Sequence, residues 1–216
     1  MARILAIADE VTEVLYGDAL QRLRPDVVVS CGDLPFDYLE NLVTRAGVPL
    51  LYVLGNHDPD LSRRSAPIGA WPTHGFGLYD PIPGPQGCIS AEGKVLEAAG
   101  VHIGGLGGSL RYKEGPNQYT QAEMRRRALR LEARARLSRG FRRGLDVLIT
   151  HAPPLGIGDA GDHAHQGFAA FHRLVAQLRP KLMLHGHVHH VPRRAVDHAL
   201  GTTLVVNAIP YRILEV

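Results

Sequence analysis

The chain has 216 residues, of which 45% are hydrophobic and 21% charged, and its formal net charge is +3. This composition is typical of a globular protein with a substantial core, and we expect one domain spanning residues 1–216. No apolar run approaches the roughly 20 residues needed to cross a bilayer, which excludes a membrane-spanning helix. Because no signal-peptide pattern follows Met1, and Cys31 and Cys88 form no disulfide framework, we expect a cytoplasmic protein.

Arginine supplies nearly all of the positive charge, and much of it falls between Arg125 and Arg143. A basic segment of this kind can attract anionic ligands. A solvated helix face is the commoner explanation, so nucleic acid is not expected as a partner.

Three strand–helix units are predicted near the start of the chain. Ile4–Ala8, Val27–Ser30 and Pro49–Leu54 are short apolar runs, typical of buried strands. Helical spacing of apolar residues follows the first two of them, at Leu15–Leu23 and Tyr38–Val43. Repeated units of this kind favour right-handed crossovers and a largely parallel sheet.

The rest of the chain continues the mixed α/β pattern after a stretch rich in Gly and Pro, Pro59–Gly87, which we interpret as a long loop over the site. Helices are predicted at Gln121–Arg139 and Phe168–Leu178. Strands are predicted at Lys94–Ala98, Val101–Leu106, Leu145–Thr150 and Leu182–Leu184, followed by antiparallel strands at Val191–Ala195, Thr202–Val206 and Tyr211–Val216.

Polar side chains follow most of the predicted strands. Asp9 and Asp33 come directly after the first two, and Gly55-Asn56-His57-Asp58 ends the third. On its own, that tetrapeptide has a simpler interpretation as an Asn-containing turn with a surface histidine. Because parallel strands end at one edge of a sheet, where α/β folds keep their ligand sites, we expect these side chains to converge. The later strand ends add His151, His187 and His189.

The residue types at these strand ends favour a metal centre. Buried acids and imidazoles are costly without partners, and such groups gathered together usually coordinate metal. Mixed oxygen and nitrogen ligands suit Mn, Fe, Zn, Co or Ni better than Ca or Mg. Asp33 has two carboxylate oxygens and is able to bridge two ions, which at about 3.5–4 Å separation would activate water and clamp a phosphoryl group.

Five separated blocks of this sequence resemble the calcineurin-like metallophosphoesterase superfamily, whose pattern is D-x-H, G-D, G-N-H-D/E, a lone H and G-H-x-H. The corresponding residues are Asp9, Gly32-Asp33, Gly55-Asn56-His57-Asp58, His151 and Gly186-His187-Val188-His189. The resemblance covers nearly the whole chain. It implies an α/β fold in the form of a four-layer α/β/β/α sandwich of two mixed sheets flanked by helices.

The resemblance also implies roles for individual residues. Asp9 and His189 would hold a first metal ion, and Asp33 would bridge it to a second. The second ion would be held by Asn56, His151 and His187. His57 would contact the substrate and protonate the leaving oxygen, and Asp58 would orient its ring. Two divalent ions are implied, with Mn²⁺ expected and Fe, Zn, Ni or Co as alternatives.

One position departs from the superfamily pattern. Val11 stands where D-x-H places a histidine ligand, so the first metal lacks one donor. Alternate residues of a strand share a face, which would leave Val11 as an apolar wall beside Asp9 and turn Glu10 away unless the strand bends. We expect water or another loop to fill the gap. Asp159–His165 is a candidate because it contains His163 and His165.

Two functions are compatible with the sequence. The first is hydrolysis of phosphomono- or phosphodiester bonds in a small phosphorylated or nucleotide-like substrate, with a metal-bound water or hydroxide as the nucleophile. The second is a non-catalytic metal-binding scaffold that retains the fold. The presence of His57 favours the enzyme. Arg111 and Tyr112, which follow a glycine loop, are equally interpretable as phosphate contacts and as a capped surface turn.

Overall fold

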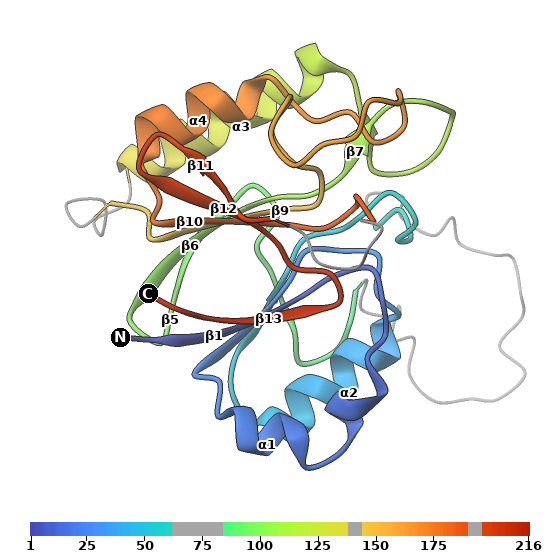
Figure 1. Ribbon diagram of the computed structural model, residues 1–216, viewed down its shortest axis with the longest axis vertical. Coiled ribbons are helices and arrows are strands. Elements are labelled where there is room, and N and C mark those ends of the chain that lie inside the picture. The colour runs from blue at the N-terminus through green and yellow to red at the C-terminus, as the bar shows by residue number, and fades with distance from the viewer. Residues whose placement is uncertain (62–83, 138–143, 190–195) are drawn as a thin grey trace, which may run out of the picture.

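Two β-sheets face each other at the centre of the molecule, and a pair of helices covers the outer face of each sheet (Figure 1). This computed structural model describes residues 1–61, 84–137, 144–189 and 196–216. The predicted four-layer α/β/β/α sandwich is confirmed, and the two sheets bring strand ends from distant parts of the chain to one edge.

The first sheet has five strands in the order β13-β1-β2-β3-β4. Strands β1 to β4 run parallel, and β13 pairs antiparallel with β1 at the edge. Three of these strands carry the predicted site residues at their carboxyl ends. Their bounds are β1 (Arg3–Ile7), β2 (Val27–Ser30), β3 (Leu50–Tyr52), β4 (Ile89–Ser90) and β13 (Tyr211–Glu215).

The second sheet has six strands in the order β11-β12-β10-β9-β6-β5. Its four central strands are parallel, and β5 and β11 pair antiparallel at the edges. A small parallel pair, β7 with β8, lies apart from both sheets. The bounds are β5 (Val95–Ala98), β6 (Val101–Leu106), β7 (Ser109–Leu110), β8 (Gln118–Tyr119), β9 (Val147–Thr150), β10 (Leu182–His185), β11 (His198–Leu200) and β12 (Thr203–Asn207).

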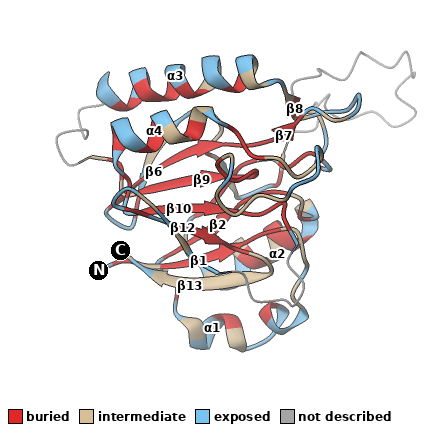
Figure 2. Cartoon of the chain, turned by 45° about the horizontal axis from the view of Figure 1, so that its top comes forward, coloured by how far each residue is buried: buried red, intermediate tan, exposed pale blue. Residues whose placement is uncertain are grey.

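Helices α1 (Ala19–Leu23) and α2 (Phe36–Ala46) pack on the first sheet, and α3 (Gln121–Leu137) and α4 (Ala170–Leu178) pack on the second. Each interface between layers has its own apolar cluster. The central strands of both sheets are buried almost throughout, the edge strand β13 is largely intermediate, and the helices bury only one face (Figure 2). Near-continuous apolar strands such as Val27–Ser30 are therefore explained by burial on both faces.

Most predicted elements are present, with three differences. The helix predicted at Leu15–Leu23 is divided, because Gly17 has extended backbone between a 3₁₀ turn, η1 (Glu13–Tyr16), and α1. The last three predicted strands were expected to be antiparallel, yet β12 runs parallel to β10 on one side. The strands β4, β7 and β8, of two residues each, and β11, of three residues, are too short for any periodicity to predict them.

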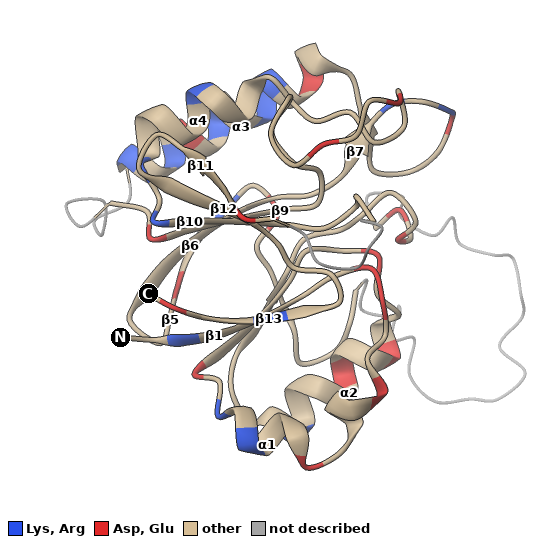
Figure 3. Ribbon diagram, in the orientation of Figure 1, with Lys and Arg blue, Asp and Glu red and all other residues tan. Residues whose placement is uncertain are grey.

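Some predictions fall outside the described residues, namely the strand at Val191–Ala195, most of the loop at Pro59–Gly87 and the end of the arginine-rich segment. Within α3 the arginines at 125, 126 and 130 are exposed, as expected of a solvated face (Figure 3). Cys31 and Cys88 are both free thiols. In the described part of the chain, no helix combines the length and hydropathy needed to span a membrane.

Candidate metal centre

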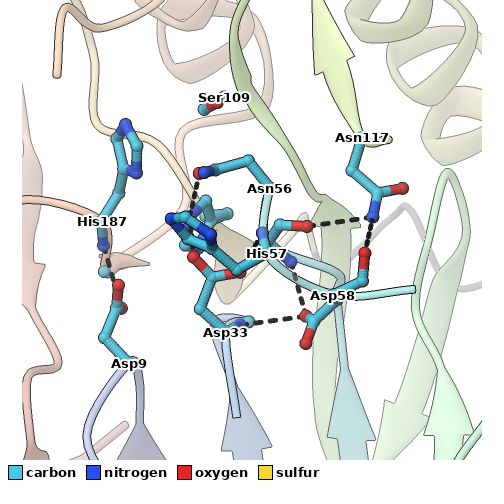
Figure 4. A network of polar contacts seen from close by, with 12 residues as sticks. Asp9, Asp33, Asn56, His57, Asp58, Ser109, Asn117 and His187 are labelled. Carbon is cyan, nitrogen blue, oxygen red and sulfur yellow. Dashed lines mark hydrogen bonds and ion pairs between the residues drawn. The ribbon is translucent and has the colours of Figure 1, made fainter. Parts of the chain in front are cut away.

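The predicted site residues lie just beyond the carboxyl ends of β1, β2, β3, β9 and β10, where the two sheets meet (Figure 4). The first sheet contributes Asp9, Asp33 and the segment from Asn56 to Asp58. The second sheet contributes His151, His187 and His189. The two groups are far apart in sequence and are joined only by the fold.

A buried cluster forms around His151. Its Nε2 atom lies 3.2 Å from Asp33 Oδ2 and 3.1 Å from Asn56 Oδ1. Candidate ligand atoms of Asp33, His151 and His187 all lie within 4.8 Å of one another. Two imidazoles, a carboxylate and an amide oxygen fit one divalent transition-metal ion. The structure therefore brings together all four residues expected at the second metal, and we call them the second-metal group.

Backbone carbonyls fix which nitrogen of each imidazole faces this cluster. The Nδ1 atom of His151 lies 2.8 Å from the Cys31 carbonyl, and Nε2 of His187 lies 2.8 Å from the Ala164 carbonyl. A carbonyl only accepts, so each of these nitrogens carries the proton. Nδ1 of His187 and Nε2 of His151 face the cluster with their rings oriented before any ligand arrives, and they would be the ligand atoms once an ion displaces the proton that Nε2 of His151 directs at Asp33 and Asn56.

The two imidazoles have opposite electrostatic environments. Burial alone would lower the pKa of His151, but its hydrogen bond to Asp33 and the charges of Asp9 and Asp33 raise that pKa to about 9. Burial, reinforced by the positive charge of His151, lowers the pKa of His187 to about 3. His187 is therefore a neutral donor, and the cluster favours a positive charge at the point where Asp33 and His151 meet.

The other side of the centre contains Asp9 and His189. The Asp9 carboxylate is buried and accepts a hydrogen bond of 2.9 Å from the His187 backbone N–H. Its second oxygen lies 3.8 Å from Nε2 of His189, whose side chain is 52% exposed. Burial raises the pKa of Asp9, partly offset by the charge of His151. We call Asp9 and His189 the first-metal pair.

Tight backbone turns at two strand ends aim these groups. Asp9 has φ 58° and His187 has φ 67°, and in each case the next residue's N–H bonds to the preceding residue's carbonyl. Such three-residue turns with positive φ are rare and strained, and they concentrate at functional sites. Gly186 is required beside them, because any side chain there would clash with the Asp9 carboxylate.

The described contacts of Asp58 differ from those expected of a residue that orients the His57 ring. Its Oδ2 atom accepts the backbone N–H groups of Gly55 at 2.7 Å and Asp33 at 2.9 Å. Among the described residues no hydrogen bond joins Asp58 to the His57 ring. Asp58 instead ties together the two loops that carry Asp33 and Asn56. His57 is exposed, its backbone N–H bonds Asp33 Oδ1 at 2.8 Å, and its side chain borders a cavity of about 450 Å³.

The structure also corrects the geometry expected at Val11. Strand β1 ends at Ile7, so strand alternation no longer applies at residues 9 to 11. Val11 is 40% exposed and makes no apolar wall. Glu10, which alternation would turn away, places Oε1 at 3.2 Å from Nδ1 of His189.

The candidate loop at residues 159–165 contacts the second-metal group in the described structure. Besides the bond from His187 to Ala164, the His165 ring lies 5.2 Å from the His187 ring, and its Nδ1 atom is bonded to Asp162. His163 is exposed. The expectation that this loop supplies a donor to the first metal stays a prediction, and the described contacts do not support it.

Two residues near the site were not assigned a role in the metal centre from the sequence. Asn117 donates to the carbonyls of Gly55 and Asp58 at 3.0 and 3.1 Å, which holds the loop after β3. The Tyr112 hydroxyl lies 3.3 Å from Nδ2 of Asn56 and so turns Oδ1 toward His151. Arg111 points elsewhere and pairs with Glu123. Only the glycine-bounded turn around these residues gave any signal in the sequence.

A four-layer sandwich with this donor set at the ends of both sheets defines the metallophosphoesterase-like class. The chain belongs to the calcineurin-like phosphoesterase family, whose model matches residues 4–191. No curated protein matches the chain.

Solved structures show the same fold at low sequence identity. One crystal structure has a TM-score of 0.62 and 19% identity, covering 96% of this chain and 90% of its own. TT1561 of Thermus thermophilus has a TM-score of 0.58 and 16% identity, with coverage of 96% and 89%. GAP50, described as the anchor in the inner membrane complex of Plasmodium, has a TM-score of 0.52 and 10% identity, with coverage of 95% and 70%.

Proposed function

We propose that this protein is a metal-dependent phosphoesterase acting on a small phosphorylated or nucleotide-like substrate. The observation that carries the proposal is the second-metal group, in which His151 lies within 3.2 Å of both Asp33 and Asn56. Divalent ions held here, with Mn²⁺ preferred in our proposal, would supply an activated water and neutralise phosphoryl charge.

The residues of this chain divide the remaining work. Asp33 supports the centre with one oxygen and, with the other, holds the backbone of His57 at 2.8 Å. His57 is exposed beside the cluster, and in our proposal it gives a proton to the leaving oxygen. The adjacent cavity of about 450 Å³ includes Leu34, Pro35 and Phe36 in its lining, which suits an organic leaving group.

The test is hydrolysis of bis(p-nitrophenyl) phosphate and p-nitrophenyl phosphate by Mn²⁺-loaded protein, followed by a screen of phosphomonoesters, diesters and nucleotides. We expect turnover that a chelator abolishes, and the relative rates on the two esters show whether the enzyme acts on monoesters or diesters. The Asp33→Asn variant should be inactive, and the exposed Asp37→Asn variant should retain activity as the matched control.

The alternative function is a non-catalytic scaffold, since one fold neighbour is described as an anchor. His57 argues against the scaffold. Its side chain is exposed at the rim of the cluster, and among the described residues its ring makes no hydrogen bond or ion pair that would give it a structural role. Tight Mn²⁺ binding without hydrolysis of any ester in the screen would favour the scaffold and reject the enzyme.

A further inference from the structure

We infer that Glu10 is a positioning residue of the first metal site and that it holds the His189 ring in the orientation needed to bind the ion. The second histidine that the superfamily pattern has at position 11 is replaced by Val11 in this chain. The inference rests on the metal centre of the proposed function but not on its catalytic activity. It concerns a side chain that the motif leaves unspecified.

The turn at Asp9 is what brings Glu10 to the site. In a continued strand, Asp9 and Glu10 would point to opposite faces. Strand β1 stops at Ile7, Asp9 adopts φ 58°, and the N–H of Glu10 bonds back to the Ala8 carbonyl at 2.6 Å. Two successive carboxylates therefore reach the same imidazole, which lies 179 positions further along the chain.

The two carboxylates meet different nitrogens of His189. Glu10 Oε1 lies 3.2 Å from Nδ1, which is hydrogen-bond distance, whereas Asp9 Oδ1 lies 3.8 Å from Nε2, which is too long for one. The two atoms lie near each other without a hydrogen bond, so both would be available to one ion. Nδ1–H donated to Glu10 leaves the lone pair of Nε2 directed toward Asp9.

The other two imidazoles of the centre follow the same rule. His151 and His187 each give one N–H to a backbone carbonyl and direct the other nitrogen into the cluster. For His189, the corresponding oxygen among the described residues is the Glu10 carboxylate. Metal-bound histidines almost always have such an oxygen partner, which sets the tautomer and raises ligand basicity.

The exposure of His189 makes this partner more important. His151 is fully buried and its rotamer is fixed by packing, but the His189 side chain is 52% exposed. An exposed imidazole without a partner would sample several rotamers, and ordering it would weaken metal binding. The Glu10 carboxylate, itself 35% exposed, restricts that freedom.

The experiment is a Mn²⁺ titration of the full chain, monitored by calorimetry and by electron paramagnetic resonance. It compares the wild type with Glu10→Ala, Glu10→Gln and the exposed control Glu13→Gln. We expect Glu10→Ala to weaken the first site by about 10–100-fold and to leave the second site unchanged. Glu10→Gln keeps an acceptor for Nδ1–H and should recover part of the affinity. Glu13→Gln should match wild type.

Three outcomes would overturn the inference. Equal affinities in wild type and Glu10→Ala would make the contact an ordinary surface ion pair. Equal losses in Glu10→Ala and Glu10→Gln would make Glu10 a direct metal ligand rather than a positioning residue. A loss at the second site in Glu10→Ala would show a general structural defect. Wild-type protein that binds two ions but hydrolyses nothing would reject the proposed function and leave the role of Glu10 standing.

Discussion

The two sides of the metal centre are built differently. The second-metal group is buried, and its imidazoles are held by the backbone carbonyls of Cys31 and Ala164. The first-metal pair has one buried member, Asp9, and one exposed member, His189, whose partner is a side chain. Backbone groups therefore orient the ligands of one half of the centre, and side-chain contacts orient those of the other half.

This difference predicts unequal metal affinities. Rigid, desolvated donors lose little conformational entropy when an ion binds, so the second site should bind its ion more tightly than the first. An exposed donor loses more freedom on binding and depends on its neighbours.

The largest effect is expected from Asp33→Asn, because Asp33 is the residue that we expect to bridge the two ions. Its carboxylate faces His151 and also bonds the His57 backbone, and it would bridge the two ions. Loss of its charge should reduce hydrolysis to background and weaken both sites by more than the roughly 10–100-fold cost of an outer contact. Metal stoichiometry, measured by elemental analysis after gel filtration, checks this. A variant that still binds two ions would contradict the bridging role.

His57→Ala should separate catalysis from metal binding. The side chain is exposed and contributes no donor to the second-metal group, so fold and metal content should be retained. We expect kcat to fall by roughly 10²–10⁴, the usual contribution of general acid–base catalysis. The loss should be smaller for esters with good leaving groups, which need little protonation. An unchanged kcat on an ester with a poor leaving group would remove His57 from the mechanism.

Much of this centre was predictable because parallel strands end at one edge of a sheet. Asp33, Asn56, His151 and His187 each follow an apolar run, and the structure gathers all four. The contacts of Glu10 were not predictable, because a three-residue turn at Asp9 cancels strand alternation and nothing in Ala8-Asp9-Glu10 requires that turn.

Contacts that do not follow from the convergence of strand ends were also beyond prediction. Asp58 was expected to meet the His57 ring, its neighbour in sequence, but it bonds backbone groups of two loops. Tyr112 reaches Asn56 across 56 positions. The break at Gly17 in the first predicted helix was not predictable either, because the helical spacing of apolar residues continues across Gly17 although its backbone is extended.

Asp58→Ala tests the structural assignment of that carboxylate. Removing it leaves the buried Gly55 N–H without its acceptor, at a cost of about 1–3 kcal/mol. For a chain of this size, the melting temperature should fall by about 2–4 °C per kcal/mol. Asp58→Asn keeps an acceptor oxygen and should melt close to wild type. If Asp58→Ala lowered kcat without changing the melting temperature, Asp58 would act on His57 as first expected.

The smallest effect is expected from Tyr112→Phe, which removes one hydroxyl beside the second-metal group. That hydroxyl lies 3.3 Å from the Asn56 amide nitrogen and turns the amide oxygen toward His151. A neutral hydrogen bond contributes about 0.5–1.5 kcal/mol, so second-site affinity should fall by up to about tenfold. The decrease should be confined to that site, because Tyr112 makes no described contact with Asp9 or His189.

Mn²⁺ titration of Tyr112→Phe against Tyr16→Phe, a tyrosine that packs on Tyr38 away from the centre, measures the effect. A weaker second site with an unchanged first site would show that even the half held by the backbone depends on one side-chain contact. If neither site changed, the buried packing of Asn56 alone would suffice to orient its amide. The second site would then not depend on the hydroxyl of Tyr112, and the difference between a side held by the backbone and a side held by side chains would be larger.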